Sequence, residues 1–521
     1  MPDLSRRMSV TVLLLALGAS SGAAMAQKAR AFTNKAAMGP YAAGVRLVEQ
    51  YDYSRTFQPA IDELGRAYPG ERGRPIQTLI WYPAEKSSRQ PMTWGDYFAL
   101  ADTEVSFGRS RAMPPAADYF KSLVAPSMND AMAGLRDAQP VHGRFPVVIY
   151  APSFSSPVWE NPELCEYLAS WGYVVIASPA MGVGRESTHD VAGTEAQARD
   201  ISFLVGYAHT LSDVDPGGVA VVGFSWGGLA NLYAAARDDR IKALIDLDGS
   251  IRYWPGLVKA AGIDPSRMTI PLLYFKSQDS IEQEAAHEVD FPIAAGPSVL
   301  NAWTQGDFYS IDMLRMTHPE FATIVYRNSN FWRDEFARLL PGDSTREDGI
   351  EGYALMEAYT KAFLDYYLEQ KREGLEFLKA PPAEHGIPPH FLVVEARPGK
   401  PPVFDFPRFR TEVLARGYEH VAQIYAEAQK NHPEFKLAAH DLEGWANDLV
   451  AGGHPAEAIA VAKFALATDA SVDAYNALGT AYLAAGKTNE AIQAFQQALV
   501  KSPHHWYAQS ALDRIRAAAA H

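Results

Sequence analysis

A serine between two glycines is the best candidate for a nucleophile in this sequence. Residues 223–227 read Gly-Phe-Ser-Trp-Gly and fit the pattern G-x-S-x-G, with Ser225 at its centre. The apolar run 219–222 is typical of a strand, and residues 229–237 are typical of a helix. The flanking glycines relieve the clash of a sharp strand-to-helix turn, and the helix N-terminus favours negative charge. We therefore predict that Ser225 is a nucleophile rather than part of an ordinary tight turn.

A serine hydroxyl needs a base, and a histidine further along the chain is the best candidate. In sites of this type the chain order is serine, acid, histidine. The histidines between Ser225 and the C-terminal region are His287, His318, His385 and His390. His318 directly follows a predicted strand at 308–314, so its loop can reach the sheet edge that carries Ser225. The others fall in a predicted surface helix or in a proline-rich stretch, and we predict that His318 is the base.

Two aspartates compete for the role of the acid that orients His318. Asp248 ends the predicted strand 243–247, and Asp279 follows the next strand, 271–275. Either carboxylate can hold the imidazole and stabilise its charged form. The spacing does not choose between them.

Acyl chemistry at Ser225 also requires two N–H groups that bind the negative charge of the intermediate. The residue after the nucleophile, Trp226, supplies one. The second is expected from residues 152–156, the loop after the predicted strand 147–151. Local sequence does not identify the residue within that loop.

Composition excludes several other kinds of chemistry. The net charge of −14 argues against nucleic acid as the main partner. The single cysteine, Cys165, rules out internal disulfides and thiolate zinc clusters, and the neighbouring Glu166 should raise its pKa. No zinc-protease, phosphate-loop or dinucleotide motif is present. We expect a structural thiol and chemistry that needs no metal or organic cofactor.

The elements that would position these residues alternate between short β-rich runs and helices. The predicted strands are 43–51, 76–82, 147–151, 173–178, 219–222, 243–247, 271–275 and 308–314. Continuous apolar runs are typical of strands buried on both faces, and helical stretches such as 164–171 and 195–211 suit crossover connections. The pattern predicts an α/β domain over residues 39–379, with a mostly parallel central sheet flanked by helices.

Two segments interrupt this alternation. Residues 85–144 are a long aromatic-rich connection, which we interpret as a helical insertion. It either covers the active-site edge as a lid or packs against the body of the domain. Eight prolines between Pro381 and Pro407 indicate a linker over 380–408.

Residues 409–521 carry an α-helical repeat. Large and small residues between Tyr475 and Pro503 fall at the spacing of a tetratricopeptide repeat, and Glu457-Ala458-Ile459 recurs as Glu490-Ala491-Ile492 after 33 residues. The first copy is degenerate, and a final segment, 506–520, would cap the stack. An alanine-rich helical bundle is the alternative. We expect a protein partner, or self-association, to use this region.

The N-terminus has the features of an export signal. Arg6 and Arg7 precede the apolar run 10–17, which is too short to span a bilayer, and Ala24-Met25-Ala26 fits a cleavage site. We predict a cleaved signal peptide over residues 1–26 and a periplasmic or secreted mature protein with no membrane span.

Together the elbow, the strand order and the His318 segment resemble the α/β-hydrolase superfamily, most closely its dienelactone hydrolase and platelet-activating-factor acetylhydrolase-like branch. The resemblance spans about residues 39–379. It implies that Phe154 supplies the second N–H, and it favours Asp248 as the acid because Asp248 and the segment His318–Phe321 match that branch. Pro152-Ser153 stand where the family has His-Gly. The repeat region is foreign to the acetylhydrolases, so their phospholipid substrate is not implied.

We therefore expect an exported serine hydrolase that cleaves a carboxylic ester through Ser225, His318 and Asp248. One alternative is an amidase or peptidase with the same residues. The other is a repeat-based scaffold whose hydrolase domain is structural or weakly active.

Overall fold

The computed structural model describes residues 32–62, 64–105, 107, 125–278, 295–327, 340–400 and 404–519. The chain divides into two compact units between Lys400 and Pro401. The predicted signal peptide, residues 1–26, lies outside the described residues. Among those that are described, no helix is both long enough and apolar enough to cross a membrane.

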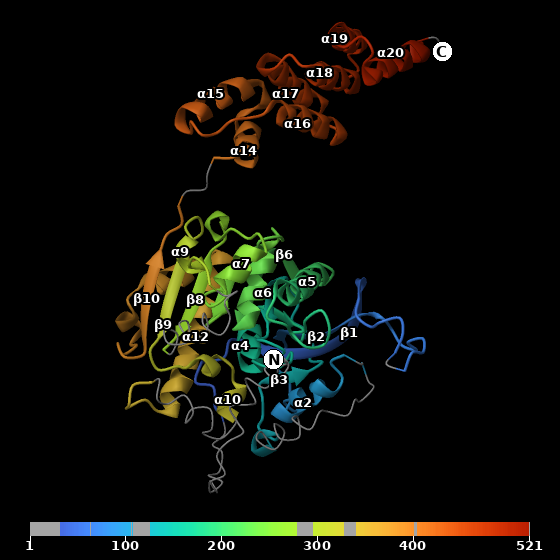
Figure 1. Cartoon of the computed structure of the whole chain (residues 1–521). Helices are drawn as coiled ribbons and strands as arrows, with labels where there is room; N and C mark the ends of the chain where they lie inside the picture. The colour runs from blue at the N-terminus through green and yellow to red at the C-terminus, as the bar shows by residue number, and fades with distance from the viewer. Residues whose placement is uncertain are drawn as a thin grey trace, which may run out of the picture. The chain divides into compact units, whose positions relative to one another are not determined.

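The strands described in the first unit form one twisted sheet (Figure 1). In chain order they are β1 (Ala42–Thr56), β2 (Gly73–Ala84), β3 (Gly134–Arg136), β4 (Phe145–Ala151), β5 (Val174–Ala177), β6 (Val214–Phe224), β7 (Ile241–Leu247), β8 (Leu272–Ser277), β9 (Phe308–Met313) and β10 (Leu392–Arg397). Their spatial order is β10-β9-β8-β7-β6-β4-β5-β2-β1-β3. The run from β9 to β5 is parallel, whereas β10, β2 and β1 join it through antiparallel pairs.

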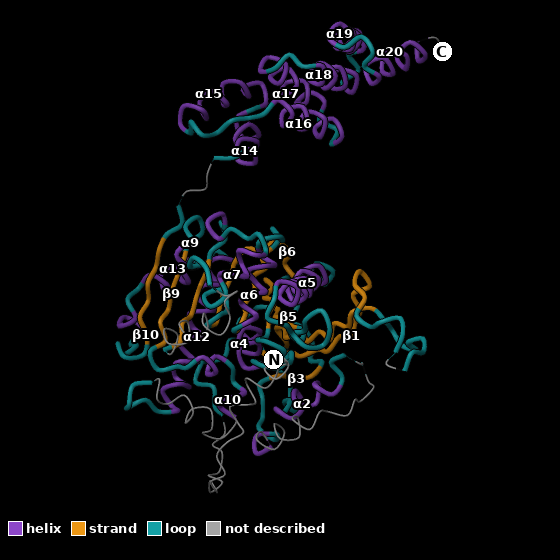
Figure 2. Tube along the Cα trace, viewed as in Figure 1, coloured by secondary structure: helices purple, strands orange, loops and turns teal. Residues whose placement is uncertain are grey.

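Helices cover both faces of this sheet because its central strands are apolar on both sides. On β4, Val148 and Tyr150 belong to one core and Val147 and Ile149 to the other. Helices α4 and α12 pack on the first face, and α5, α6 and α7 pack on the second (Figures 1 and 2). The predicted α/β fold, a mostly parallel central sheet flanked by helices, is confirmed.

The helices of this unit include long crossover helices and short turns. They are α2 (Trp94–Phe98), α4 (Pro162–Ser170), α5 (Val191–Ala208), α6 (Trp226–Ala235), α7 (Pro255–Ala260), α9 (Val299–Ala302), α10 (Ile324–Arg327), α12 (Arg346–Tyr367) and α13 (Arg372–Lys379). Short 3₁₀ turns are η2 (Ala99–Asp102), η3 (Ala125–Ser127), η4 (Pro265–Arg267), η6 (His318–Phe321) and η8 (Pro382–His385).

The prediction of a linker over 380–408 is wrong for most of that range. Residues 392–397 form β10, which pairs antiparallel with β9 from Leu392–Met313 to Arg397–Phe308. The prolines of this stretch stand before and after the strand rather than inside it, and an edge strand needs hydrogen bonds on only one side. The helices of the second unit then begin at Phe406, inside the predicted linker.

The insertion predicted over 85–144 is only partly helical. Its described part contains α2 and two 3₁₀ turns, but it also contains β3, which pairs parallel with β1. Trp94 and Tyr97 are fully buried in the core of the unit. These two aromatic residues therefore pack against the body of the domain, while Tyr119 and Phe120 lie outside the described residues.

The second unit is a stack of helices with its own apolar core. Its elements are α14 (Phe406–Arg416), η9 (Tyr418–His420), α15 (Val421–Asn431), α16 (Ala439–Ala451), α17 (Pro455–Thr468), α18 (Val472–Ala484), α19 (Thr488–Lys501) and α20 (Trp506–Ala519). Small residues let successive helices approach closely. At Gly479 an added Cβ would lie only 2.7 Å from the Phe495 ring, so this contact requires glycine.

Candidate active site

Ser225 occupies a strained turn between β6 and α6. Its φ of 53° and ψ of −118° lie outside the regions that a serine ordinarily adopts. A Cβ on Gly223 would lie 2.4 Å from Nδ2 of Asn231, and one on Gly227 would lie 2.0 Å from the carbonyl oxygen of Ala151. Both glycines of the elbow are thus required by close packing, and the turn has the shape that the motif predicts.

The structure brings Ser225, His318 and Asp248 together in one chain of hydrogen bonds. Nε2 of His318 lies 3.0 Å from Oγ of Ser225, and its Nδ1 lies 2.6 Å from Oδ2 of Asp248. Both separations are within hydrogen-bond reach. The Asp248 side chain is fully buried, whereas the His318 side chain is 22% exposed. The arrangement can move a proton from the serine to the imidazole while the carboxylate balances the new charge.

The carboxylate of Asp248 receives further hydrogen bonds from the end of β8. The Ser277 N–H donates to it over 3.1 Å and the Ser277 hydroxyl over 2.5 Å. Burial by itself would raise the pKa of Asp248, but the hydrogen bonds from His318 and Ser277 outweigh burial and hold the pKa below its ordinary value. No motif signals Ser277, which sequence reasoning missed. Asp279 lies outside the described residues.

His318 opens the 3₁₀ turn η6, which follows β9. Thr317 and Glu320 cap the turn reciprocally, with the Thr317 N–H donating to Glu320 over 2.8 Å. Asn161, just before α4, donates from Nδ2 to the carbonyl oxygen of Phe321 over 2.9 Å. The ring of Phe224 lies 5.0 Å from the imidazole ring, centroid to centroid. The imidazole of His318 is therefore held by its own turn and by the start of α4.

The loop after β4, residues 152–156, leaves one N–H group without a protein acceptor. Pro152 has no N–H. Three others donate within the protein: Ser153 to Oε2 of Glu160 (2.8 Å), Ser155 to Oγ of Ser187 (3.1 Å) and Ser156 to the carbonyl of Ser153 (3.1 Å). Across the described part of the chain, the N–H of Phe154 donates to no protein acceptor. Phe154, the residue that the family resemblance implies, is thus the one in this loop whose N–H is left for another acceptor.

Trp226, the first residue of α6, offers the second such group. Its N–H also donates to no acceptor among the described residues. The rings of Phe154 and Trp226 meet edge to face at 5.4 Å, which places the two residues side by side. His189 stacks on Phe154 at 4.0 Å and lies 5.2 Å from the Trp226 ring. N–H groups without a protein acceptor, one of them on the residue that follows Ser225, are the kind of donor that can bind a negatively charged oxygen.

Cys165 has no part in this site. It is buried in α4, and burial first and the nearby Glu166 carboxylate second raise the pKa of its thiol well above the ordinary value. The predicted effect of Glu166 is confirmed. Among the described residues, no three His, Cys, Asp or Glu side chains gather in a group that could hold a metal ion.

Comparison with known proteins gives a family match and a likeness to solved structures. Residues 444–505, which span parts of α16 to α19, match the tetratricopeptide repeat family. No curated protein matches the chain by sequence. A solved structure of a ferulic acid esterase from Streptomyces cinnamoneus is similar with a TM-score of 0.48 and 18% identity, over 70% of this chain and 98% of that one.

Proposed function

We propose that this chain is a serine hydrolase that cleaves a carboxylic ester. The observation that supports the proposal best is the hydrogen-bonded series from Ser225 through His318 to Asp248 at a strained strand-to-helix turn. A histidine that bonds a serine on one nitrogen and a buried carboxylate on the other is the arrangement that activates a hydroxyl.

In the proposed first half-reaction, Oγ of Ser225 attacks the ester carbonyl carbon while Nε2 of His318 takes the hydroxyl proton. The carbonyl oxygen becomes negative and accepts hydrogen bonds from the N–H groups of Trp226 and Phe154. Asp248 stabilises the imidazolium without taking its proton. The C–O bond to the alcohol then breaks, and His318 gives its proton to the departing alcohol.

The second half-reaction repeats these steps with water. His318 takes a proton from the water as its oxygen attacks the acyl carbon bound to Ser225, and the same two N–H groups hold the new oxyanion. The bond to Oγ breaks, Ser225 recovers its proton, and the carboxylic acid leaves.

Fluorophosphonate labelling tests this proposal. We expect a covalent adduct at Ser225 of the native protein, located by peptide mass mapping, and no adduct in Ser225→Ala. Ser266→Ala, which changes an exposed serine of η4 outside the proposed site, should be labelled as the native protein is. Failure of the folded native protein to react would contradict the proposal.

Hydrolysis assays then separate the ester from its alternatives. We expect turnover of p-nitrophenyl esters and at least a hundredfold slower turnover of the matching p-nitroanilides. The opposite order would favour an amidase or peptidase.

The repeat region supports a further, separate role in protein interaction. Residues 444–505 match a repeat family whose stacked helices offer extended binding surfaces. A partner that binds Ser225→Ala as well as the native chain, but not a chain ending at Lys400, would support this role. We also propose that the mature protein is exported, which N-terminal sequencing of the protein recovered from the periplasm or culture medium would test.

A further inference from the structure

A buried glutamate outside the proposed relay supports the loop that carries Phe154. Glu160 lies just before α4 and is 4% exposed. Its Oε2 accepts the N–H of Ser153 over 2.8 Å and the hydroxyl of Tyr150 over 3.2 Å, and its Oε1 accepts the hydroxyl of Ser153. The carboxyl group thus connects the end of β4 and the loop 152–156 to the start of α4.

Burying a carboxyl group is unfavourable unless hydrogen bonds compensate for the loss of water. Burial raises the pKa of Glu160, and the hydrogen bonds from Ser153, Ser156 and Tyr150 act against that rise. Every one of these donors belongs to the strand β4 or to the loop after it. The compensation is therefore available only while the loop keeps its present conformation.

Glu160 favours the loop conformation in which the N–H of Phe154 has no protein acceptor. Because the Ser153 N–H is held by Glu160, the peptide plane before Ser153 is fixed, and the next N–H along the chain is that of Phe154. Ser155 is strained, with a φ of 53°, so the turn needs external support to persist.

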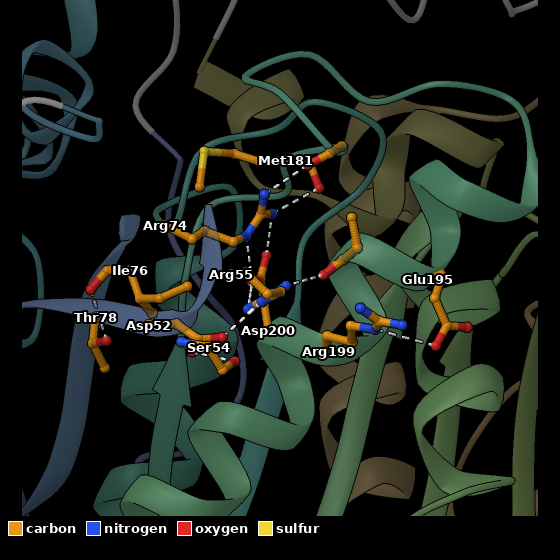
Figure 3. A network of polar contacts seen from close by, with 12 residues as sticks. Asp52, Ser54, Arg55, Arg74, Ile76, Thr78, Met181, Glu195, Arg199 and Asp200 are labelled. Atoms are coloured by element: carbon orange, nitrogen blue, oxygen red, sulfur yellow. Dashed lines mark hydrogen bonds and ion pairs between the residues drawn. The ribbon is translucent and has the colours of Figure 1, made fainter. Parts of the chain in front are cut away.

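Support from the opposite side comes from the loop between β5 and α5. Ser187 exchanges two hydrogen bonds with Ser155, at 3.1 and 2.8 Å. Arg74 donates to the carbonyl oxygens of Met181 and Gly182 and also pairs with Asp200, which fixes the start of that loop (Figure 3). Glu160 is the contact on the α4 side, the one that holds the N–H adjacent to Phe154.

We propose that Glu160 is a positioning residue for the oxyanion site, acting through Ser153 on the N–H of Phe154. The proposal rests on the proposed hydrolase function. It assigns to Glu160 no contact with the substrate and no proton transfer. Its loss should therefore weaken the binding of a tetrahedral, negatively charged species more than the binding of the ester itself.

The test compares Glu160→Gln with Glu166→Gln. Glu160→Gln removes the charge and replaces one of the two acceptor oxygens by an amide N–H₂ group, which would face donors from Tyr150 or Ser153, so the loop should shift. Glu166 is a matched control: it lies in the same helix region, is 2% exposed and accepts three hydrogen bonds, from Tyr97, Ala133 and Gly134, none of them in the loop 152–156. The two variants lose a similar buried carboxylate, but only one should affect the oxyanion site.

We expect kcat on the best p-nitrophenyl ester to fall about 10- to 100-fold in Glu160→Gln, somewhat less than the loss of a whole oxyanion donor, with KM changed less than about threefold. Inhibition by a trifluoromethyl ketone of the same chain length, which forms a charged tetrahedral adduct, should weaken by a similar factor. The acid limb of the kcat/KM profile, which reports on His318, should stay in place. Glu166→Gln should match the native enzyme in all three measurements.

Ser153→Ala provides a milder second variant in case Glu160→Gln does not fold. It removes the hydroxyl contact but keeps the N–H contact, and we expect kcat to fall about three- to tenfold, with a matching loss in ketone affinity. If the native enzyme is active, and if both substitutions leave its kcat and its affinity for the ketone unchanged, the proposed role of Glu160 is wrong while the proposed function stands. A native enzyme that neither hydrolyses esters nor reacts with fluorophosphonate would overturn the proposed function, and the role of Glu160 with it.

Discussion

Asp246, in β7, and Asp248, in the loop directly after it, lie in contrasting environments. Asp248 is held by His318 and Ser277, and its pKa is lowered. Asp246 is also fully buried, but neither carboxylate oxygen has a hydrogen-bond partner within the described part of the chain. Burial first, and the charge of Asp248 second, raise the pKa of Asp246 well above its ordinary value. The two environments thus shift the pKa values of these two carboxyl groups in opposite directions.

Asp246→Asn should change how stability depends on pH. Above pH 4 the folded state keeps a proton on Asp246 that the unfolded state loses, so the free energy of unfolding falls as pH rises, until the pH passes the pKa of Asp246 in the folded state. Asparagine does not titrate. The free energy of unfolding of the variant should therefore rise relative to that of the native protein by about 1.4 kcal/mol per pH unit in that range. Urea unfolding at pH 5 and pH 7 measures this. A constant difference between the two proteins would contradict the pKa direction.

At the scale of elements, the turn between β6 and α6 depends on close packing as much as on its own backbone. The start of α6 lies directly against the end of β4, since an added Cβ at Gly227 would meet the Ala151 carbonyl at 2.0 Å. Backbone cannot yield in the way that the tip of a flexible side chain can. The same contact brings Trp226 beside the loop that carries Phe154, so the proposed oxyanion site can form only when the two elements pack together.

Gly227→Ala should therefore be costly for both stability and reactivity. We expect a loss of about 1–3 kcal/mol in the free energy of unfolding and a strong decrease in the rate of fluorophosphonate labelling, because α6 must move away from β4. Gly206→Ala in α5 is the control. Its added Cβ would meet only Arg240, at 3.7 Å. The variant should therefore keep native reactivity, and its free energy of unfolding should rise by about 0.5–1 kcal/mol. Equal effects of the two substitutions would refute the packing argument.

At the scale of the whole molecule, the first unit ends later than the prolines indicate. β10 completes the sheet next to β9, and Phe391 and Leu392 are buried in its core. A chain ending at Lys379 would lose this strand, expose the edge of β9 and leave apolar surface uncovered.

We predict that a chain ending at Lys400 stays folded and keeps its reactivity toward fluorophosphonate, whereas one ending at Lys379 is markedly less stable or aggregates. Thermal unfolding and size-exclusion chromatography of the two truncated chains, beside the full chain, check this. Similar melting temperatures for the two truncated chains would show that β10 adds little to the sheet.

The sequence by itself determined the features that depend on local pattern. Eight strands, the elbow at Ser225 and the repeat between residues 444 and 505 follow from apolar runs, glycine spacing and helical periodicity within short windows. The position of His318 followed from its place after a strand, because the C-terminal ends of parallel strands meet at one edge of the sheet.

Only the tertiary structure decided which groups meet across the sheet edge. Sequence spacing left Asp248 and Asp279 open, and the contact of Asp248 with His318 joins residues 70 positions apart. The sequence pattern did not indicate the contacts of Ser277 or Glu160, and it did not predict β3 and β10, each a short edge strand. The physical reason is the same in each case: a buried carboxylate or an edge strand is stabilised by donors that arrive from distant segments, and no local window of residues contains both partners.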